Sequence, residues 1–312
     1  MRIKIFSGQI VPFMLATLLL FTMAGPQITA ETTQPGDESW RQELLEEREN
    51  KDIEFRTSPT SPMAGSARLT FSAADRTYVA IADGNVAARP HAGAGTVFSV
   101  RSSQGKWYWG DAAPDVNCRL GERAIAPDAD ALAAGSLFTA GRFTLAVYPS
   151  PQGMALIVFD PQRPQLLSFK HLLYYAPDPA YAVKARLVRF AEKKAVKIIT
   201  TRKLEKTFYR YARIRFSLAG RELELTALKS SLEGPDSRDL FIPFKDDTNG
   251  RESYEVGRFI DVPEPAGEEF ILDFNRCYNP LCNYSPAYNC PLPPLENFLE
   301  IAVQAGEKTY PH

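Results

Sequence analysis

The chain has 312 residues, and its 36 Lys and Arg residues nearly balance its 37 Asp and Glu residues, which leaves a formal net charge of −1. This balance provides no electrostatic attraction to nucleic acid or to an anionic membrane surface, so we expect neither as a partner. Hydrophobic residues make up 45% of the chain, as in ordinary globular proteins, whereas 24 prolines favour loops and edge strands over long helices.

The first 30 residues have the pattern of a signal peptide. Arg2 and Lys4 form a positive start, which is followed by the apolar run `IVPFMLATLLLFTMA`. The small residue Ala30 is suited to cleavage before Glu31. A retained membrane anchor is the alternative, but the run is shorter than the roughly 20 apolar residues that span a bilayer. We therefore predict export to the periplasm or the medium, with no transmembrane span after cleavage.

Residues 31–65 are predicted to form a linker and one short helix. Ser39 has the properties of an N-cap, and Gln42 three positions later completes a capping-box pattern. The stretch `SWRQELLEEREN` is too short to be a stable helix alone, so we expect it to pack on the residues that follow. The prolines of `TSPTSPM` end it.

Between residues 66 and 160 the hydrophobic period changes to two, which is typical of β-strands. Short runs rich in β-branched and aromatic residues are separated by turn dipeptides such as Asp83-Gly84 and Gln104-Gly105. The runs are `RLTF`, `TYVAIA`, `TVFSV`, `KWYW`, `RFTLAVY` and `MALIVF`. Their spacing predicts an N-terminal β-sandwich module or small barrel.

Residues 161–312 form a second predicted β domain, which ends in a segment rich in Cys and Pro. Its clearest hairpin is `RIRFSLAGRELELTAL`, with Ala219-Gly220 as the turn, and `RDLFIPF` and `EEFILDF` are further strands. Strands do not alternate with helices, which argues against a parallel sheet. The predicted fold class is all-β and mainly antiparallel, with two sandwich-like or barrel-like modules preceded by a short α-helix.

Two long stretches resemble an uncharacterised bacterial family known as domain of unknown function 1684. They are `FIPFKDDTNGRESYEVGRFIDV` and `LDFNRCYNPLCNYSPAYNCPLPPLENFLEIAVQAGEKTY`, and `FKHLLYYAPDPAYAVKARL` resembles the middle of the family. The N-terminal stretch `IEFRTSPTSPM` is also similar to it. The resemblance implies a fold and an association with the cell envelope, and it implies no activity.

A second resemblance concerns residues 66–160. The stretch `DVNCRLGERAIAPDADALAAGSLFTAG` is similar to the closing strands of forkhead-associated sandwiches. Those domains bind phosphothreonine through an Arg in a Gly-Arg turn and a Ser-x-x-His loop. Neither feature occurs here, because His91 is not preceded by Ser at the required distance. The resemblance therefore implies the sandwich shape and not phosphopeptide binding.

The four cysteines are even in number, which favours disulfides in an exported protein. The resembling family has Cys at both Cys282 and Cys290, and a bond between them would contribute about 2.6 kcal/mol by the loop-entropy argument. Cys118 and Cys277 could then pair with each other. A zinc site made by all four is the alternative, but the spacing C-x4-C-x7-C differs from the usual C-x2-C. We predict no metal ion and no cofactor.

Polar side chains are concentrated in the stretches `DDTNGRESYEVGR` and `DFNRCYN`. The first begins with a tight turn at Asn249-Gly250, and alternate residues of the second would share one face of a strand. Such residues form either a hydrogen-bonded framework for irregular backbone or a ligand surface. The ligand-binding candidates are Asp246, Thr248, Tyr254, Arg258, Asp273, Asn275, Arg276, Tyr278, Asn279, Glu296 and Asn297.

Familiar catalytic motifs are absent from the sequence, including G-x-S-x-G, H-E-x-x-H, the P-loop and G-x-G-x-x-G. We therefore expect a non-catalytic envelope protein that binds a small molecule, a glycan or an envelope protein. Arg and Tyr suit such recognition. One alternative is a hydrolase or lyase that uses two of the carboxylates Asp246, Asp273, Glu296 and Glu307. The other is a purely structural module.

Overall fold

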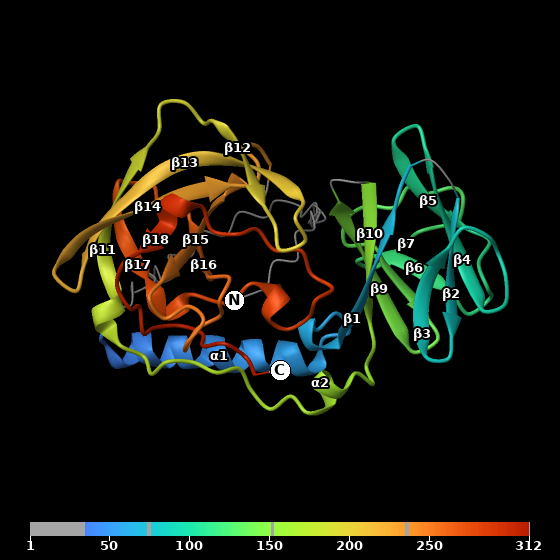
Figure 1. The fold of residues 1–312 in the computed structure, drawn as a ribbon, viewed down its shortest axis with the longest axis horizontal. Coiled ribbons are helices and arrows are strands. Elements are labelled where there is room, and N and C mark those ends of the chain that lie inside the picture. Colours follow the sequence, from blue (N-terminus) through green and yellow to red (C-terminus); the bar gives the residue numbers. More distant parts are fainter. Residues whose placement is uncertain (1–34, 74–75, 151–152, 235–236, 312) are drawn as a thin grey trace, which may run out of the picture.

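The structure is a computed structural model that describes residues 35–73, 76–150, 153–234 and 237–311. The predicted signal peptide and its cleavage site lie outside these residues. Figure 1 shows two groups of β-sheet side by side, with a long helix beneath one of them. Among the helices of the described ranges, none has the length and apolar composition needed to cross a bilayer.

Helix α1 spans Glu38–Thr57 and is longer than the predicted stretch. Its Glu, Gln, Leu, Lys and Arg residues are good helix formers, and it ends just before Pro59, which forces Ser58 into an extended conformation. The N-cap is Asp37 and not Ser39, which lies in the first turn. The helix packs on residues that follow it, as predicted, because Trp40, Leu44, Lys51 and Phe55 are buried along one face.

The first group of strands forms two packed sheets. One has the order β1-β10-β9-β8-β6-β7 and the other β3-β2-β4-β5, and every neighbouring pair is antiparallel. Phe98 of one sheet stacks on Phe138 of the other at a ring distance of 4.5 Å. The strands are β1 (Gly65–Phe71), β2 (Thr77–Ala82), β3 (Asn85–Arg89), β4 (Thr96–Ser103), β5 (Lys106–Gly110), β6 (Asn117–Leu120), β7 (Arg123–Ala124), β8 (Leu137–Ala140), β9 (Phe143–Ser150) and β10 (Gly153–Phe159).

The second group forms one larger sheet with the order β16-β15-β14-β13-β11-β17. β12 pairs with β13, and the short β18 pairs in parallel with β15. Figure 1 shows this sheet arching over residues 274–311, called here the C-terminal segment, with α1 on the other side of that segment. The strands are β11 (Ala182–Arg189), β12 (Ala195–Ile199), β13 (Glu205–Leu218), β14 (Arg221–Lys229), β15 (Asp239–Asp246), β16 (Arg258–Pro263), β17 (Glu269–Asp273) and β18 (Phe298–Leu299).

Short helical turns connect these elements. They are η1 (Pro62–Ala64), α2 (Pro164–Leu167), η2 (Pro179–Tyr181), η4 (Phe274–Arg276), η5 (Leu281–Asn283) and η6 (Leu295–Asn297). The predicted hairpin turn at Ala219-Gly220 is confirmed, since both residues have positive φ, of 51° and 74°. The predicted all-β, mainly antiparallel fold with one N-terminal helix is confirmed.

The core has parts inside each group of strands and a part between them. One cluster lies within the sandwich, and another lies between the larger sheet and the C-terminal segment. A third cluster contains residues of both groups, with Ile157 and Phe159 of β10 beside Phe208 of β13 and Tyr288 of the C-terminal segment. The two groups of sheet are therefore joined by apolar packing.

Candidate functional site

Arg258 and Asp246 form an ion pair that is fully shielded from solvent. The Arg258 guanidinium donates to Asp246 Oδ2 at 2.6 Å, and both side chains have 0% exposure. The same guanidinium donates to the carbonyls of Val303 at 2.7 Å and Ala305 at 2.5 Å. Two residues predicted to bind a ligand thus hold the C-terminal segment against β15 and β16.

Asp246 also shapes the turn that follows it. Its Oδ1 accepts hydrogen bonds from the Thr248 amide at 2.8 Å and the Thr248 hydroxyl at 2.6 Å. Asn249 closes the turn through hydrogen bonds to Ser253 Oγ at 2.9 Å and the Tyr254 carbonyl at 2.7 Å. Asp246 and Thr248 are buried, so the framework alternative describes these two residues better than an open ligand surface does.

The stretch after Asp273 is a turn of 3-10 helix and not a strand, so the predicted alternation of faces there is wrong. Asp273 accepts a hydrogen bond from the Asn275 amide at 2.9 Å, which bends the chain into η4. Asn275 in turn makes two hydrogen bonds with the backbone of Asp178, at 2.9 and 2.8 Å. Asp273 also accepts a hydrogen bond from the indole N–H of Trp40, at 2.9 Å, and so anchors the start of α1.

Glu307 is the centre of a second buried polar cluster. Its Oε1 forms an ion pair with Lys51 of α1, and its Oε2 accepts from the Asn279 amide and the Tyr284 hydroxyl, each at 2.7 Å. Burial and the neighbouring Glu307 raise the pKa of Tyr284, so its hydroxyl remains a donor. Gly306 lets the chain just before Glu307 pass close to Cys277, because a Cβ at this position would lie 2.3 Å from Cys277 Sγ.

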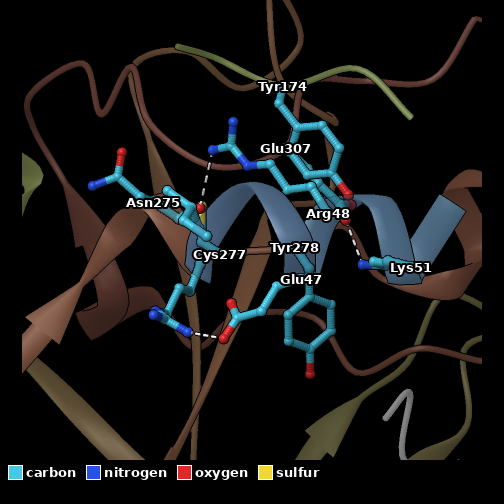
Figure 2. Close-up of a pocket in the computed structure, with 10 residues that line it drawn as sticks. Glu47, Arg48, Lys51, Tyr174, Asn275, Cys277, Tyr278 and Glu307 are labelled. Carbon is cyan, nitrogen blue, oxygen red and sulfur yellow. Dashed lines mark hydrogen bonds and ion pairs between the residues drawn. The ribbon is translucent and has the colours of Figure 1, made fainter. Parts of the chain in front are cut away.

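A small cavity opens between α1 and these residues (Figure 2). Its interior volume is about 20 Å³, and about 290 Å³ including the space at its open mouth. Asn275, Arg276 and Tyr278 are the three predicted ligand-binding residues that it brings together. The complete lining is Leu44, Glu47, Arg48, Lys51, Tyr174, Asn275, Arg276, Cys277, Tyr278 and Glu307.

Three of the lining residues are cations, and two of these have carboxylate partners. Lys51 pairs with Glu307, and Arg276 pairs with Glu47 and, at 3.2 Å, with Glu43. Within the described residues, no carboxylate forms an ion pair with the third cation, Arg48.

Arg48 is half-buried and reaches neutral groups. It donates to the carbonyls of Tyr175 at 3.0 Å and Asn275 at 3.4 Å, and its guanidinium lies 4.4 Å from the centre of the Tyr174 ring. Its buried Nε has no hydrogen-bond partner among the described residues. Burial lowers the pKa of Arg48, which is the direction expected for a cation that loses water.

The sequence predictions did not include Arg48, Lys51 or Tyr174. A signal for the first two was present in the helix pattern. Trp40, Leu44 and Phe55 occupy one face at helical spacing, and positions 48 and 51 fall on the same stripe. Cations on a stripe that is otherwise apolar indicate buried partners.

The remaining ligand-binding candidates do not line the cavity. Asn297 is buried and bonds the Thr226 amide at 2.7 Å and the Pro243 carbonyl at 2.7 Å. Glu296 is exposed and pairs with Arg210 at 3.3 Å, beside a separate groove that residues of β12, β13 and β14 line together with Pro294. Asn279 belongs to the Glu307 cluster, where its amide donates to the carboxylate. The Tyr254 hydroxyl donates to Cys282 Sγ.

All four cysteines are free thiols in this structure, so the predicted disulfides are not formed in it. Cys118 lies in the sandwich core and Cys277 in the core of the larger sheet, so the predicted pairing of these two is wrong. Cys282 and Cys290 are adjacent, with the Cys282 amide 3.2 Å from Cys290 Sγ. The described residues contain no group of three or more His, Cys, Asp or Glu side chains that could hold a metal ion.

The chain matches a protein-family description and resembles a solved structure. No curated protein matches it. The solution NMR structure of an uncharacterized protein from Haloarcula marismortui is 36% identical and has a TM-score of 0.40, over 48% of this chain and 83% of that one. The family described as "protein of unknown function (DUF1684)" matches residues 167–308, which contain or overlap three of the four stretches that resemble it. The chain therefore belongs to this family of proteins of unknown function, DUF1684.

Proposed function

We propose that this protein is an exported binding protein that holds a small ligand through an anionic group, in the cavity between α1 and the C-terminal segment. The observation that carries the proposal is Arg48, whose half-buried guanidinium lines the cavity without a carboxylate partner among the described residues. Export is inferred from the pattern of the first 30 residues.

The chemistry of Arg48 favours an oxyanion as its partner. A guanidinium removed from water is usually paired, because its charge is costly to bury alone. Carbonyls and the Tyr174 ring compensate part of this cost but supply no full negative charge. A guanidinium presents its N–H groups in a planar fork that matches carboxylate and phosphate groups.

The size of the cavity limits the ligand. An interior of about 20 Å³ accepts roughly one water-sized group, so an oxygen of the ligand enters and its remainder occupies the mouth. Arg276 lies at the same cavity with 27% of its side chain exposed, but its charge is paired with Glu43, Glu47 and Asp273, so Arg48 is the cation left for the ligand. A compact acidic molecule or the acidic end of a glycan fits these constraints.

The hydrolase alternative receives no support from this geometry. Glu47 and Glu307 are the carboxylates that line the cavity, and both are ion-paired. Both oxygens of Glu307 already accept hydrogen bonds or an ion pair, which leaves no lone oxygen positioned to act as acid or base. Asp246, Asp273 and Glu296 are engaged in three separate networks.

The proposal is tested by thermal unfolding in the presence of small probes. The protein is purified from the exported fraction, where a mature chain beginning at Glu31 is expected. Acetate, phosphate and glucuronate are compared with the neutral molecules acetamide and glucose. An anionic probe at about 100 times its Kd should stabilise the protein by about 2.7 kcal/mol, and neutral probes should not.

Two variants connect the effect to the cavity. Arg48→Met should abolish the stabilisation by the anionic probe, measured against the variant's own melting temperature. Arg41→Met, on the exposed side of the same helix, should retain it. Equal responses of the two variants, or no response of the wild type to any anion, would contradict the binding site. An intact leader on a cytosolic product would contradict export.

A further inference from the structure

The thiols of Cys282 and Cys290 contact each other at a place that the cavity does not involve. The Cys282 amide donates to Cys290 Sγ at 3.2 Å, and both side chains belong to the same packed cluster. The Tyr254 hydroxyl donates to Cys282 Sγ at 3.6 Å, and the Cys290 amide donates to Thr201 Oγ1 at 3.1 Å. Surrounding groups therefore hold both sulfurs in position.

The two thiols differ in access and in acidity. Cys282 is partly exposed, whereas Cys290 is buried with 6% exposure. Hydrogen bonds from Cys290, and then from Tyr254 and Thr201, lower the pKa of Cys282 despite its partial burial. The hydrogen bond with Cys282 and burial raise the pKa of Cys290. An accessible, more acidic thiol beside a buried partner is the arrangement that thiol–disulfide exchange requires.

The loop between these cysteines lies where the two groups of sheet meet. Ala287 and Tyr288 pack in the shared cluster with Ile157 and Phe159 of β10. The Ser285 hydroxyl donates to the carbonyl of Gly65, at the start of β1, at 2.7 Å. A covalent bond across the ends of this loop would therefore restrain the contact between the sandwich and the larger sheet.

We propose that Cys282 and Cys290 form a reversible dithiol–disulfide pair that exchanges with small-molecule or protein disulfides. The Cys282 thiolate attacks a sulfur of the incoming disulfide, which forms a mixed disulfide and releases one thiolate. Cys290 then loses its proton and attacks Cys282 Sγ, which releases the second thiolate. The incoming disulfide is reduced to two thiols, and the two cysteines are oxidised to one disulfide.

The test uses the full mature protein, with oxidised and reduced glutathione as the probes. Oxidised glutathione should lower the mass of the wild type by two hydrogen atoms, and reduced glutathione should restore it. Cys290→Ser should accumulate one glutathione on Cys282, because the second attack is missing. Cys282→Ser should remain unmodified. In the reduced wild type, iodoacetamide should label Cys282 about tenfold faster than Cys290.

Cys118→Ser serves as the control, because Cys118 is buried in the sandwich core and should not affect the exchange. Circular dichroism of each variant shows whether it is folded. Should a variant fail to fold, the labelling rates of the two thiols in the wild type decide the question alone. Equal labelling rates, a wild type unchanged by oxidised glutathione, or a disulfide that reduced glutathione does not reopen would each overturn the proposal.

Discussion

At the scale of single residues, Arg258 of β16 and Asp246 of β15 act as framework for the C-terminal segment. Their charges are removed from water, which costs free energy. The ion pair and the hydrogen bonds from the guanidinium to the carbonyls of Val303 and Ala305 offset this desolvation cost. Arg48 differs from Arg258 in this respect. Its hydrogen bonds reach only neutral carbonyls, which is why we assign the binding role to Arg48 and a structural role to Arg258.

Arg258→Met tests the structural role. The substitution leaves the Asp246 carboxylate buried without its cation, so the free energy of unfolding should fall by about 3–5 kcal/mol. Urea denaturation at neutral pH measures it. Arg213→Met is the matched control, because the Arg213–Glu224 pair lies at the surface and should be worth about 1 kcal/mol or less. Similar losses in both variants would show that the Arg258 pair is not a structural centre.

At the scale of elements, α1 is held beneath the larger sheet by polar contacts as well as by its buried apolar face. Trp40 bonds Asp273 near its start, Lys51 pairs with Glu307 near its end, and Arg276 reaches Glu43 and Glu47 between them. The helix thus forms one wall of the cavity (Figure 2). Because the cavity exists only while α1 is docked, the stability of this contact sets the stability of the site.

Trp40→Phe tests the docking of α1. The ring is retained and the hydrogen bond to the Asp273 carboxylate is lost, which should cost about 1.5–3 kcal/mol locally. Native-state hydrogen exchange should show faster exchange of the α1 amides, by about tenfold or more, with little change in β2 and β4 of the sandwich. Trp107→Phe in the sandwich is the control and should leave α1 protected. Unchanged exchange of α1 in the first variant would refute this account of the docking.

At the scale of the whole molecule, the sandwich is an insertion in the sequence between α1 and the strands of the larger sheet. The chain leaves the larger unit at Gly65 and returns after Phe159, and Figure 1 shows β1 and β10 side by side at the junction. The shared apolar cluster contains residues from both units, among them Ala146 of β9 and Tyr288. Tyr288 also packs edge-on against Tyr148, at a ring distance of 6.4 Å. We therefore expect this cluster to couple the unfolding of the two units.

Tyr288→Ala tests the coupling. Removing the buried ring should cost about 3–5 kcal/mol, by analogy with other large-to-small aromatic substitutions. Calorimetry should show a single transition in the wild type and two separated transitions in the variant, one for the sandwich and one for the larger sheet. Tyr108→Ala, in β5 and outside the shared cluster, should lower the transition temperature without separating the two units. Two transitions already present in the wild type would contradict the coupling.

Local patterns alone determined the fold class and the main strands of this protein. Alternating apolar residues and turn dipeptides specify antiparallel hairpins within a few residues, so β2, β13 and β14 could be located without tertiary information. The short strand β3 escaped notice, because a run of five residues with two Ala and a polar residue at each end has little local signal. Family membership likewise followed from a linear stretch of sequence.

The roles of the charged residues were decided only by the tertiary structure. Lys51 looks like a solvated residue of a charged helix, and it is buried because Glu307, 256 positions later, lies opposite it. Asp246 and Arg258 look like ligand contacts and become framework because the C-terminal carbonyls surround them. A charge acquires its role from its partner and its distance from water, and the folded chain, not the local sequence, sets both.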